Sequence, residues 1–372
     1  MRIKRPPIIA KTRREEFGGL IFRERPPFLA QVNHTYADMY GMEEAPSDAI
    51  MQKGVFSGPV DAHLALTTRC NMACEGCYST HPDDPAYDIP LESAKQIIDK
   101  LAELGCFSLS FGGGEPTLHP QLFDIAAYAR EKQILPNMTT NGLTMTEDFA
   151  KNSIILGNIH FSIHALKDAE HLYESIRIYR KITGNAPGLN LLLTNETLSS
   201  LDKILMETRK AGVGKVLFLR HKTTAKNQDV SELSSNKDLK DFPKMLKELR
   251  GANRRMMFLF DCSLFELMAQ SGFSNMKRYR FFDCNGCMGG NANIAIDVKG
   301  YYKPCSFWPN PFGHMSELTF DSWVNNPAQK AFRDMRKSNA CLTCEYGTIC
   351  RGGCRLLYAD GKRLDLEIEI AD

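Results

Sequence analysis

The sequence lacks any apolar run long enough to cross a membrane. Its longest strongly apolar stretch, near residues 256–260, has five residues, whereas a membrane-spanning helix needs about 20. The first residues after Met1 are basic and proline-rich, with no apolar core behind them, so a standard secretory signal is not expected. We therefore expect a cytoplasmic protein without a membrane partner.

An excess of charge of one sign is also lacking. The 46 Lys and Arg residues are balanced by 44 Asp and Glu residues, which leaves a net charge of +2. This balance predicts neither a nucleic-acid partner nor an acidic membrane surface. Apolar residues make up 43% and charged residues 24% of the chain, which is the composition of a globular protein and excludes a wholly disordered one.

Cysteine, by contrast, is abundant and clustered. Three of the 12 cysteines lie in residues 70–77 and seven lie in residues 284–354. In a chain without a secretory signal, such clusters indicate metal binding or catalysis rather than disulfide bonds. The remaining two stand alone: we interpret Cys106 as a packed apolar residue and assign no role to Cys262.

The length of 372 residues suggests two or three domains. Residues 1–58 are expected to form a small, basic N-terminal unit, with strands at residues 17–22 and 28–32 followed by a short helix at residues 36–42. Residues 255–372 are rich in Gly, Pro and Cys, with one helix expected near residues 319–336. A loop-rich region of this size needs more than a small apolar core, and bound metal would supply the missing stability.

Residues 59–254 alternate between short apolar runs and segments with helical spacing. Strands are expected at residues 63–66, 107–111, 135–139, 159–163, 189–193 and 216–219. Strand–helix alternation of this kind predicts an α/β fold with a parallel sheet. Six units are too few for a closed eight-stranded barrel, so we expect a partial (β/α)6 TIM-like barrel.

The first cysteine cluster has the spacing Cys70-x3-Cys74-x2-Cys77 and is followed directly by Tyr78. Soft thiolates at this density select iron–sulfur clusters, zinc or copper(I). A structural zinc site is normally closed by four ligands, whereas three cysteines leave one position open. The cluster follows the first expected strand of the sheet, where open α/β folds carry their active sites.

This spacing, with an aromatic residue after it, resembles that of the radical S-adenosylmethionine (SAM) enzymes. The resemblance implies that Cys70, Cys74 and Cys77 hold a [4Fe–4S] cluster, whose fourth iron binds SAM and whose electron cleaves it to a 5′-deoxyadenosyl radical. Further matches fall at or near the ends of the successive strands. The resemblance implies that SAM is bound by Tyr78, by Gly113, Gly114 and Glu115 of a Gly-Gly-Glu-Pro motif, by Thr140 and Asn141 of a Thr-Thr-Asn-Gly motif, and by Ser162, Asn195, Leu219 and Arg220.

The second cysteine cluster has two parts. Its spacing is Cys287-x12-Gly300-x4-Cys305, followed by Cys341-x2-Cys344-x5-Cys350-x3-Cys354. The spacing alone is equally typical of zinc ribbons. Behind a radical SAM motif, however, it resembles the SPASM extension of that family, which implies one or two auxiliary [4Fe–4S] clusters and a loop-rich C-terminal SPASM domain.

The family pattern divides these cysteines between two clusters. It assigns Cys287, Cys305 and Cys354 to the first auxiliary cluster, with Cys284 as a fourth ligand, and it assigns Cys341, Cys344 and Cys350 to the second. The family's last cysteine has no counterpart after Cys354. The second cluster is therefore expected to keep an open iron, to take a carboxylate ligand from residues 365–372, or to be smaller or absent.

Three functions are compatible with these motifs. SPASM enzymes commonly modify peptides, and the N-terminal unit loosely resembles leader-peptide-binding winged-helix domains, although a hairpin that covers the barrel is equally compatible. We favour an oxidoreductase or maturase that crosslinks or oxidises a peptide or protein side chain, such as a ribosomally made peptide, and that receives electrons from a flavodoxin or ferredoxin type of protein. The alternatives are the same chemistry on a haem precursor or other small molecule, and a non-enzymatic cluster protein that carries electrons or regulates. No catalytic acid or base can be named.

Overall fold

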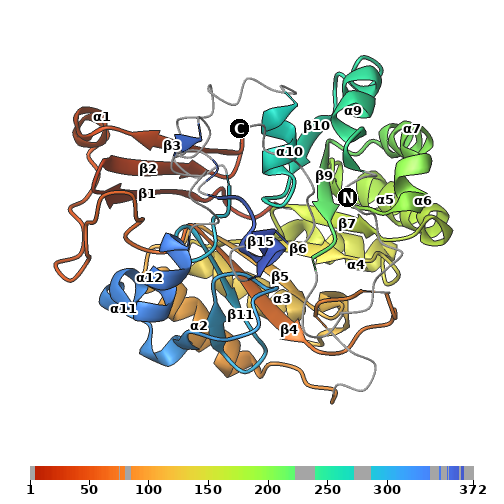
Figure 1. Ribbon diagram of the computed structural model, residues 1–372. Coiled ribbons are helices and arrows are strands. Elements are labelled where there is room, and N and C mark those ends of the chain that lie inside the picture. The colour runs from red at the N-terminus through yellow and green to blue at the C-terminus, as the bar shows by residue number, and fades with distance from the viewer. Residues whose placement is uncertain are drawn as a thin grey trace.

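The structure of the protein is a computed structural model (Figure 1). It describes residues 5–74, 76–79, 85–222, 239–271, 286–335, 343–344, 350, 352–359 and 362–363. Cys284, Cys341 and residues 365–372 therefore lie outside the described residues. Within the described part of the chain, no helix is long and apolar enough to cross a membrane.

A ten-stranded sheet forms the centre of the molecule. Its six central strands are β4 (Asp61–Thr67), β5 (Ser108–Gly113), β6 (Leu135–Thr140), β7 (Ile159–Ile163), β8 (Gly188–Leu193) and β9 (Lys215–Arg220). They are all parallel, and each is hydrogen-bonded to its neighbour in the chain. The six strands expected from the sequence are thereby confirmed.

Strands from the last third of the chain extend this sheet on both sides. β10 (Met257–Phe260) adds in parallel to β9, and β11 (Asn293–Ile296) adds in parallel to β4. Antiparallel β12 (Tyr301–Lys303) and β13 (Gly313–His314) follow β11. Among the described strands no ladder closes the sheet on itself. The α/β fold with a parallel sheet is confirmed, and the sheet crosses the boundary that we expected at residue 254.

Amphipathic helices connect the parallel strands. They are α2 (Leu91–Glu103), α3 (Leu122–Glu131), α4 (Glu147–Asn152), α5 (Ala169–Thr183), α6 (Asn195–Ser199), α7 (Leu201–Ala211), α9 (Phe242–Arg250) and α10 (Phe265–Gln270). In α2 the buried residues are Ala94, Ile97, Ile98 and Leu101, which lie on one face of the helix. Successive helices pack on one another, as α2 does on α3 and α4 on α5 (Figure 1).

These connections place the functional loops. Short 3-10 helices, η1 (Pro116–Leu118), η2 (Ser153–Ile155) and η3 (Leu166–Asp168), also follow strands or helices of this part. Because each connection returns the chain to the amino end of the next strand, all six strands end at the same edge of the sheet. The loops that carry the sequence motifs therefore gather at this carboxyl edge.

The one helix expected near residues 319–336 is two helices. α11 (Phe320–Asn325) and α12 (Pro327–Asp334) are separated at Asn326. The side chain of Asn326 accepts hydrogen bonds from the backbone of Ala328 and Gln329, and Pro327 cannot continue the hydrogen-bonding of the preceding helix. The remaining short elements are η5 (Met315–Glu317), η6 (Arg355–Leu357), β14 (Tyr358–Ala359) and β15 (Lys362–Arg363).

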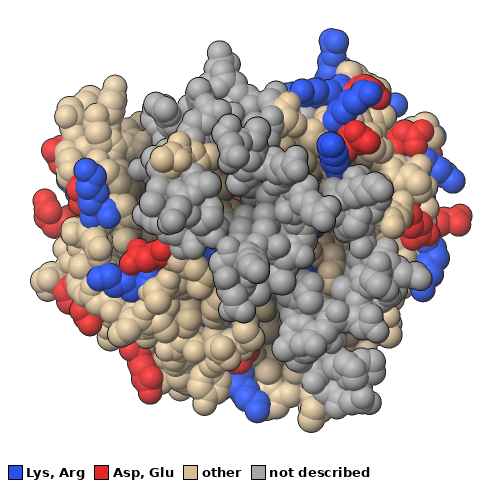
Figure 2. Space-filling model, viewed as in Figure 1, with Lys and Arg blue, Asp and Glu red and all other residues tan. Residues whose placement is uncertain are grey.

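On the face shown in Figure 2, the basic and acidic side chains of the described residues lie interspersed. This distribution agrees with the net charge of +2 for the whole chain.

The N-terminal unit is a separate antiparallel sheet. Its strands are β1 (Ala10–Glu15), β2 (Gly18–Arg23) and β3 (Phe28–Val32), in that order, and α1 (His34–Met39) follows (Figure 1). Two of these strands were expected. β1 was not predicted, because its charged residues are typical of a solvent-exposed segment. In the structure, however, the side chains of Arg13 and Glu15 are only 8% and 1% exposed.

Arg13 fixes this sheet to the large one. Its guanidinium pairs with Glu15 at 2.7 Å and donates to the carbonyls of Gly58, Pro59, Leu104 and Gly105 at 2.8–3.3 Å. These carbonyls belong to the segments that lead into β4 and β5. The N-terminal unit therefore docks at the amino ends of the parallel strands, opposite the edge that carries the motif loops.

A buried ion pair makes a second attachment. The Nη2 atom of Arg130, near the end of α3, lies 2.8 Å from Glu24 Oε1, and both side chains are less than one-tenth exposed. The other Glu24 oxygen accepts from the backbone of Ile9 at 3.0 Å. Burial acts to raise the pKa of Glu24, but the hydrogen bonds from Arg130 and Ile9 outweigh burial and lower it. The pair is therefore charged at neutral pH, and its stabilising effect is lost as the pH falls through the lowered pKa.

We expect Arg130→Met to destabilise the protein by about 3–5 kcal/mol, because it leaves the Glu24 charge buried without a partner. The N-terminal unit should then become sensitive to limited proteolysis, and urea unfolding measures the loss of stability. Asp38→Asn is the matched control, since it removes an ion pair with Arg14 in which the Asp38 side chain is 66% exposed. That change should cost less than about 1 kcal/mol. Equal effects of the two variants would contradict the prediction.

Candidate active site

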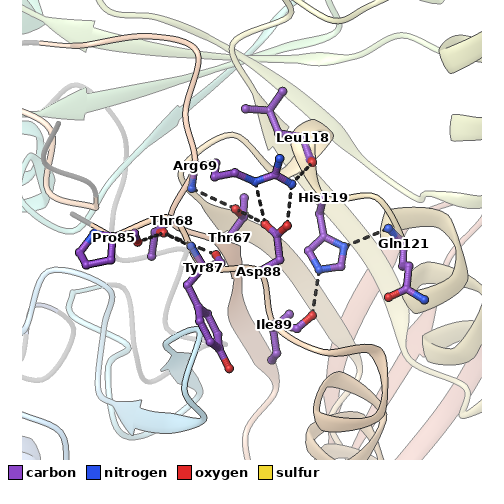
Figure 3. A network of polar contacts seen from close by, with 10 residues as sticks. All are labelled: Thr67, Thr68, Arg69, Pro85, Tyr87, Asp88, Ile89, Leu118, His119 and Gln121. Carbon is purple, nitrogen blue, oxygen red and sulfur yellow. Dashed lines mark hydrogen bonds and ion pairs between the residues drawn. The ribbon is translucent and has the colours of Figure 1, made fainter. Parts of the chain in front are cut away.

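The loop with the first three cysteines starts from a polar network at the end of β4 (Figure 3). Arg69 makes a two-pronged contact with Asp88, from Nε to Oδ1 at 3.0 Å and from Nη2 to Oδ2 at 2.6 Å. Its Nη2 also donates to the carbonyl of Leu118 at 2.6 Å, and Thr67 donates to Asp88 Oδ1 at 2.6 Å. The network joins the start of the cysteine loop to the segment before α2 and to the turn after β5.

The charge on Asp88 is part of this arrangement. Burial acts to raise the pKa of Asp88, but the hydrogen bonds from Thr67 and Arg69 outweigh it and lower the pKa. The carboxylate is therefore ionised at neutral pH, and the charge-assisted pair holds Arg69 in place beside Cys70.

The cysteine loop itself is partly open to solvent. Cys70 is exposed, and Cys74 and Cys77 are half-buried. The backbone of Cys77 donates to the carbonyl of Cys74 at 3.2 Å, in a turn that places Gly76 at a φ of +68°. Partial desolvation by the surrounding loop raises the pKa of Cys70, and the nearby charges of Glu115 and Cys77 also raise it. The loop thus folds back so that Cys70 lies near both Cys77 and the end of β5.

Three strand ends hold this loop in place. Asn141, after β6, donates from Nδ2 to Oδ1 of Asn71 at 2.7 Å. His221, after β9, lies with Nε2 at 3.3 Å from the carbonyl of Gly76. The hydroxyl of Ser79 donates to the carbonyl of Gly113 at the end of β5. The thiols of one short loop are therefore positioned by the carboxyl ends of β5, β6 and β9.

Glu115 connects two of the predicted motifs. Its side chain is almost fully buried, and burial raises its pKa despite four hydrogen bonds. Oε1 accepts from the hydroxyls of Thr140 at 2.8 Å and Thr117 at 2.7 Å and from the backbone of Thr117 at 3.2 Å, and Oε2 accepts from the backbone of Asn141 at 2.8 Å. Protein donors thus occupy both oxygens, so this carboxylate also positions the turn that carries Asn141.

The two glycines before Glu115 are required by close backbone contacts. Gly113 has a φ of +108°, and a Cβ there would lie 2.4 Å from the carbonyl oxygen of Thr67. A Cβ on Gly114 would lie 2.0 Å from the carbonyl oxygen of Arg69. These approaches allow Gly114 and Glu115 to donate to the carbonyls of Thr67 and Arg69 at 2.7 and 2.9 Å. The β5 turn and the start of the cysteine loop are therefore in direct backbone contact.

The other predicted SAM-binding residues lie at the same edge. Ser162 is in β7 and half-buried, Asn195 is the exposed first residue of α6, and Leu219 and Arg220 end β9. Arg220 is buried and Leu219 is half-buried. The structure thus places all of the predicted positions at the carboxyl edge, on both sides of the cysteine loop.

A second group of thiols gathers beyond β9 and β10, and it contains a residue that the sequence did not indicate. Cys262, just after β10, has a thiol that interacts with the thiols of Cys287 and Cys354. Cys305 interacts electrostatically with Cys287 and Cys354. Three of the four come from the predicted first auxiliary set; Cys262 had no assigned role, and Cys284 lies outside the described residues.

Cationic side chains surround this second group. Lys222 forms a buried ion pair with Asp261, the neighbour of Cys262, and interacts with Cys262 and Cys354. The hydrogen bond from Cys262 lowers the pKa of Cys287, and the positive charge of Arg355 lowers it further. Burial of Cys287 acts in the opposite direction but does not outweigh them. Buried thiols next to fixed positive charges are suited to bind metal as thiolates.

The predicted second auxiliary set lies only partly within the described residues. Cys350 is buried and Cys344 is exposed, and Cys341 lies outside the described part of the chain. Within that part, no three His, Cys, Asp or Glu side chains converge to hold a single metal ion. A four-iron cluster does not need such convergence, because each of its thiolates binds a different iron. Cys106 is buried at the start of β5, where its thiol contacts the carbonyl of Ser108 at 3.2 Å.

Aromatic side chains connect the two cysteine groups. The ring of Tyr78, directly after Cys77, lies against the ring of Phe307 with centroids 4.0 Å apart. Lys222 Nζ lies 4.5 Å from the centroid of the same Phe307 ring. Because Phe307 lies two residues after Cys305, this contact joins the segment after Cys77 to the segment after Cys305.

Comparisons with known proteins agree with this site. Residues 64–190 match the family model of the radical SAM superfamily, and residues 287–345 match the SPASM model, described as an iron–sulfur cluster-binding domain. This chain belongs to the radical SAM superfamily. The two matches contain the cysteine loop and two of the four cysteines of the second group, Cys287 and Cys305, so the resemblance seen in the motifs is confirmed.

Relatives among characterised proteins are synthases and maturases. An AdoMet-dependent heme synthase of Methanosarcina barkeri is 25% identical over 319 residues, which cover 78% of this chain and 89% of the relative. Mycofactocin maturase MftC of Mycobacterium tuberculosis is 23% identical over 317 residues, which cover 80% of this chain and 78% of the relative. The radical SAM protein described here is therefore an enzyme, and its cofactors are SAM and iron–sulfur clusters.

Two solved structures have the same fold. SuiB of Streptococcus suis bound to its precursor peptide SuiA matches with a TM-score of 0.74 at 15% identity and covers 94% of each chain. The AdoMet-bound protein anSMEcpe matches with a TM-score of 0.63 at 17% identity and covers 82% of this chain and 93% of its own. The fold of this radical SAM enzyme, including its N-terminal part, thus has a counterpart in SuiB.

Gly114→Ala should separate the β5 turn from the cysteine loop, because the new methyl group would overlap the carbonyl of Arg69. We expect a loss of stability of about 1–3 kcal/mol, as for other forced close contacts. The first cluster should also be lost, which iron analysis after anaerobic reconstitution would detect.

Gly112→Ala is the matched control for this prediction. A Cβ on Gly112 meets no atom within 4 Å, so the variant should keep its melting temperature and its iron content. Loss of iron from the Gly112 variant, or retention of iron by the Gly114 variant, would refute the role given to this close contact.

Proposed function

We propose that this enzyme modifies a side chain of a peptide or protein, by crosslinking or oxidation, through radical chemistry started by SAM cleavage. The observation that carries the proposal is an open groove over one face of the N-terminal sheet, lined by residues of all three of its strands. This unit is attached to the parallel sheet by the contacts of Arg13 and Arg130. Support comes from the similarity to mycofactocin maturase and from the fold shared with peptide-bound SuiB.

The first step belongs to the loop of Cys70, Cys74 and Cys77. Three thiols on one loop, one exposed and two half-buried, fit a [4Fe–4S] cluster with one iron left for SAM. The cluster, when bound, supplies one electron that splits SAM into methionine and a 5′-deoxyadenosyl radical. The chain contributes position: the contacts to Asn71, Gly76 and Ser79 hold the loop over the carboxyl edge.

The surrounding residues have binding and orienting roles in this proposal. Gly113 and Gly114 bring backbone close to the methionyl end of SAM, and Glu115 holds Thr140 and Asn141 in place. The residues expected at the ribose and adenine side are Ser162, Asn195, Leu219 and Arg220. Tyr78 closes the site towards the second cysteine group, where it packs on Phe307.

The overall reaction is balanced by two single-electron steps. A flavodoxin or ferredoxin type of protein would supply the one electron needed for SAM cleavage, and 5′-deoxyadenosine would carry away the hydrogen atom taken from the substrate. A cluster held by Cys287, Cys305 and Cys354 would accept the one electron that the substrate gives up, with one proton released as the new bond forms. The contact between Tyr78 and Phe307 supports this role, because it joins the segments that follow Cys77 and Cys305.

The proposed docking site for the peptide is a groove of about 1050 Å³ in the N-terminal unit. Its lining is mainly apolar and includes Ile21, Phe28, Val32, Tyr36 and Tyr40, with Lys11 and Arg23 as its basic residues. β3 pairs with β2 on one side and with no strand on the other among the described residues. An extended segment with apolar and acidic side chains could add to this edge, with its backbone supplying affinity.

Thiols in such numbers also favour a reducing compartment, which supports a cytoplasmic location for this enzyme.

The cluster assignment predicts the result of a reconstitution experiment. Loaded anaerobically with iron and sulfide, the chain should bind about 12 irons if both auxiliary clusters form and about 8 if only one does. With SAM and dithionite it should release 5′-deoxyadenosine. The triple variant Cys70→Ala, Cys74→Ala and Cys77→Ala should lose about four irons and all SAM cleavage, whereas Cys106→Ala should keep both. A chain that binds zinc instead of iron and cleaves no SAM would exclude the proposal.

Peptide docking can be tested by fluorescence anisotropy with a labelled peptide encoded beside this enzyme's gene. Tyr36→Ala removes an aromatic ring from the groove and should weaken binding about tenfold, since a buried aromatic contact contributes about 1–2 kcal/mol. Met39→Ala is the control on the same helix, because Met39 is 75% exposed and does not line the groove. Equal binding by the two variants would place the docking site elsewhere.

The same chemistry on a haem precursor is a second candidate, favoured by the similarity to AdoMet-dependent heme synthase. The two functions differ in which substrate stimulates the formation of 5′-deoxyadenosine. Incubation of the loaded enzyme with an iron porphyrin that carries propionate groups should then increase 5′-deoxyadenosine formation, and the peptide should not. Stimulation by the peptide alone would support the maturase.

A further inference from the structure

We propose that Cys262, and not Cys284, is the fourth ligand of the first auxiliary cluster, together with Cys287, Cys305 and Cys354. This inference rests on the proposed function to the extent that the cluster is the [4Fe–4S] group of the SPASM domain. It makes the site a closed one, in which every iron carries a protein thiolate and none is left for substrate.

The placement of Cys262 is the main argument. Four separate segments bring the four cysteines together: the turn after β10, the segment before β11, the segment after β12 and the segment before η6. The Cys262 thiol interacts with the thiols of Cys287 and Cys354. The geometry agrees: Lys222 pairs with Asp261, the neighbour of Cys262, and its Nζ lies 4.5 Å from the ring centroid of Phe307, two residues after Cys305. A cysteine whose only role was packing would not need to meet two thiols from distant parts of the chain.

The turn that carries Cys262 is firmly held. The backbone of Asp261 donates to the carbonyl of Phe218 in β9 at 3.1 Å, and Leu264 donates to the carbonyl of Asp261 at 3.0 Å. The Asp261 carboxylate accepts from the backbone of Ser263 at 2.8 Å and pairs with Lys222. The side chain of Cys262 is thus directed by a hydrogen-bonded turn on the edge of the parallel sheet.

The charge around the site fits a four-thiolate cluster. Lys222 is buried beside Cys262 and Cys354, and Arg355 is buried beside Cys287. Two carbonyls pin the Arg355 guanidinium, with Nε at 2.6 Å from the oxygen of Phe332 and Nη2 at 2.9 Å from the oxygen of Arg333. A set of four thiolates and its sulfides would bring the negative charge that these two cations match.

The remaining nitrogen of the Arg355 guanidinium, Nη1, also supports a cluster at this site. Nη1 is buried and makes no hydrogen bond within the described part of the chain. A buried donor without an acceptor costs about 1–3 kcal/mol, so an acceptor is expected there. The sulfur atoms of a cluster held by Cys287 would supply it, because such sulfurs accept hydrogen bonds from the protein.

One cubane has four irons, and each takes one protein ligand. If Cys262, Cys287, Cys305 and Cys354 are those ligands, Cys284 is left over, although its Cys-x2-Cys spacing to Cys287 resembles a chelating pair. The two candidates are therefore mutually exclusive for this cluster, and the proposal can be decided by exchanging each of them separately.

The experiment uses the full chain that carries Cys70→Ala, Cys74→Ala and Cys77→Ala, so that only auxiliary clusters are observed. Cys262→Ser and Cys284→Ser are each added, and iron content and electron paramagnetic resonance are measured after anaerobic reconstitution and reduction. We expect Cys262→Ser to lose about four irons, or one iron where a three-iron cluster remains, together with the reduced-cluster signal. Cys284→Ser should match its parent, as should the control Cys106→Ser. The opposite pattern, with loss in the Cys284 variant and none in the Cys262 variant, overturns the proposal.

A measurement on the unmutated, loaded enzyme guards against a variant that fails to fold. Iodoacetamide labelling followed by mass spectrometry should find Cys262 protected in the loaded chain and labelled after a chelator has removed the iron. Labelling of Cys262 at the same rate with and without iron would overturn the assignment. Neither experiment uses SAM cleavage, so a chain that binds iron at Cys262 but releases no 5′-deoxyadenosine would contradict the proposed function alone.

Discussion

The buried carboxylate of Glu115 is the interaction on which the site depends. Its two oxygens bind the turn after β6, and its backbone binds the start of the cysteine loop after β4. Three neighbouring strand ends are thereby fixed relative to one another. Burial of a charge is costly unless hydrogen bonds compensate it. Here four protein donors offset part of that cost, although burial still raises the pKa of Glu115. The polar residues that are expected to touch SAM can therefore be few, because this internal network already determines where they lie.

A second principle is that the two cysteine groups share one edge of one sheet. β9 ends in Arg220 and leads to His221 and Lys222: His221 contacts the first cysteine loop, whereas Lys222 pairs with Asp261 in the second group. Two consecutive residues thus contact both groups. The region of the second group is therefore an extension of the parallel sheet through β10 and β11.

The sequence predicted those features that are local. The six parallel strands were recognisable because each apolar run is flanked by a helix with a clear apolar face, and the cysteine loop because its ligands are close in the chain. β1 was missed because its charged residues are buried by distant parts of the chain, which no local pattern records. Arg13 contacts the carbonyls of Gly58 and Gly105, and Glu15 accepts a hydrogen bond from the backbone of Ser57. Cys262 was missed for the same kind of reason: its neighbours come from β10 pairing with β9 and from β11 pairing with β4.

The position of the N-terminal unit has a consequence for the size of the substrate. This unit docks at the amino ends of strands that are six or seven residues long, such as β4 and β5, and so lies about 20 Å from the carboxyl edge. A peptide anchored beside β3 would need a tether of at least six extended residues to reach the radical site. The anchor would also raise the local concentration of every residue within that reach. Selectivity would then be a matter of tether length, with residues too close to the anchor left untouched however reactive they are.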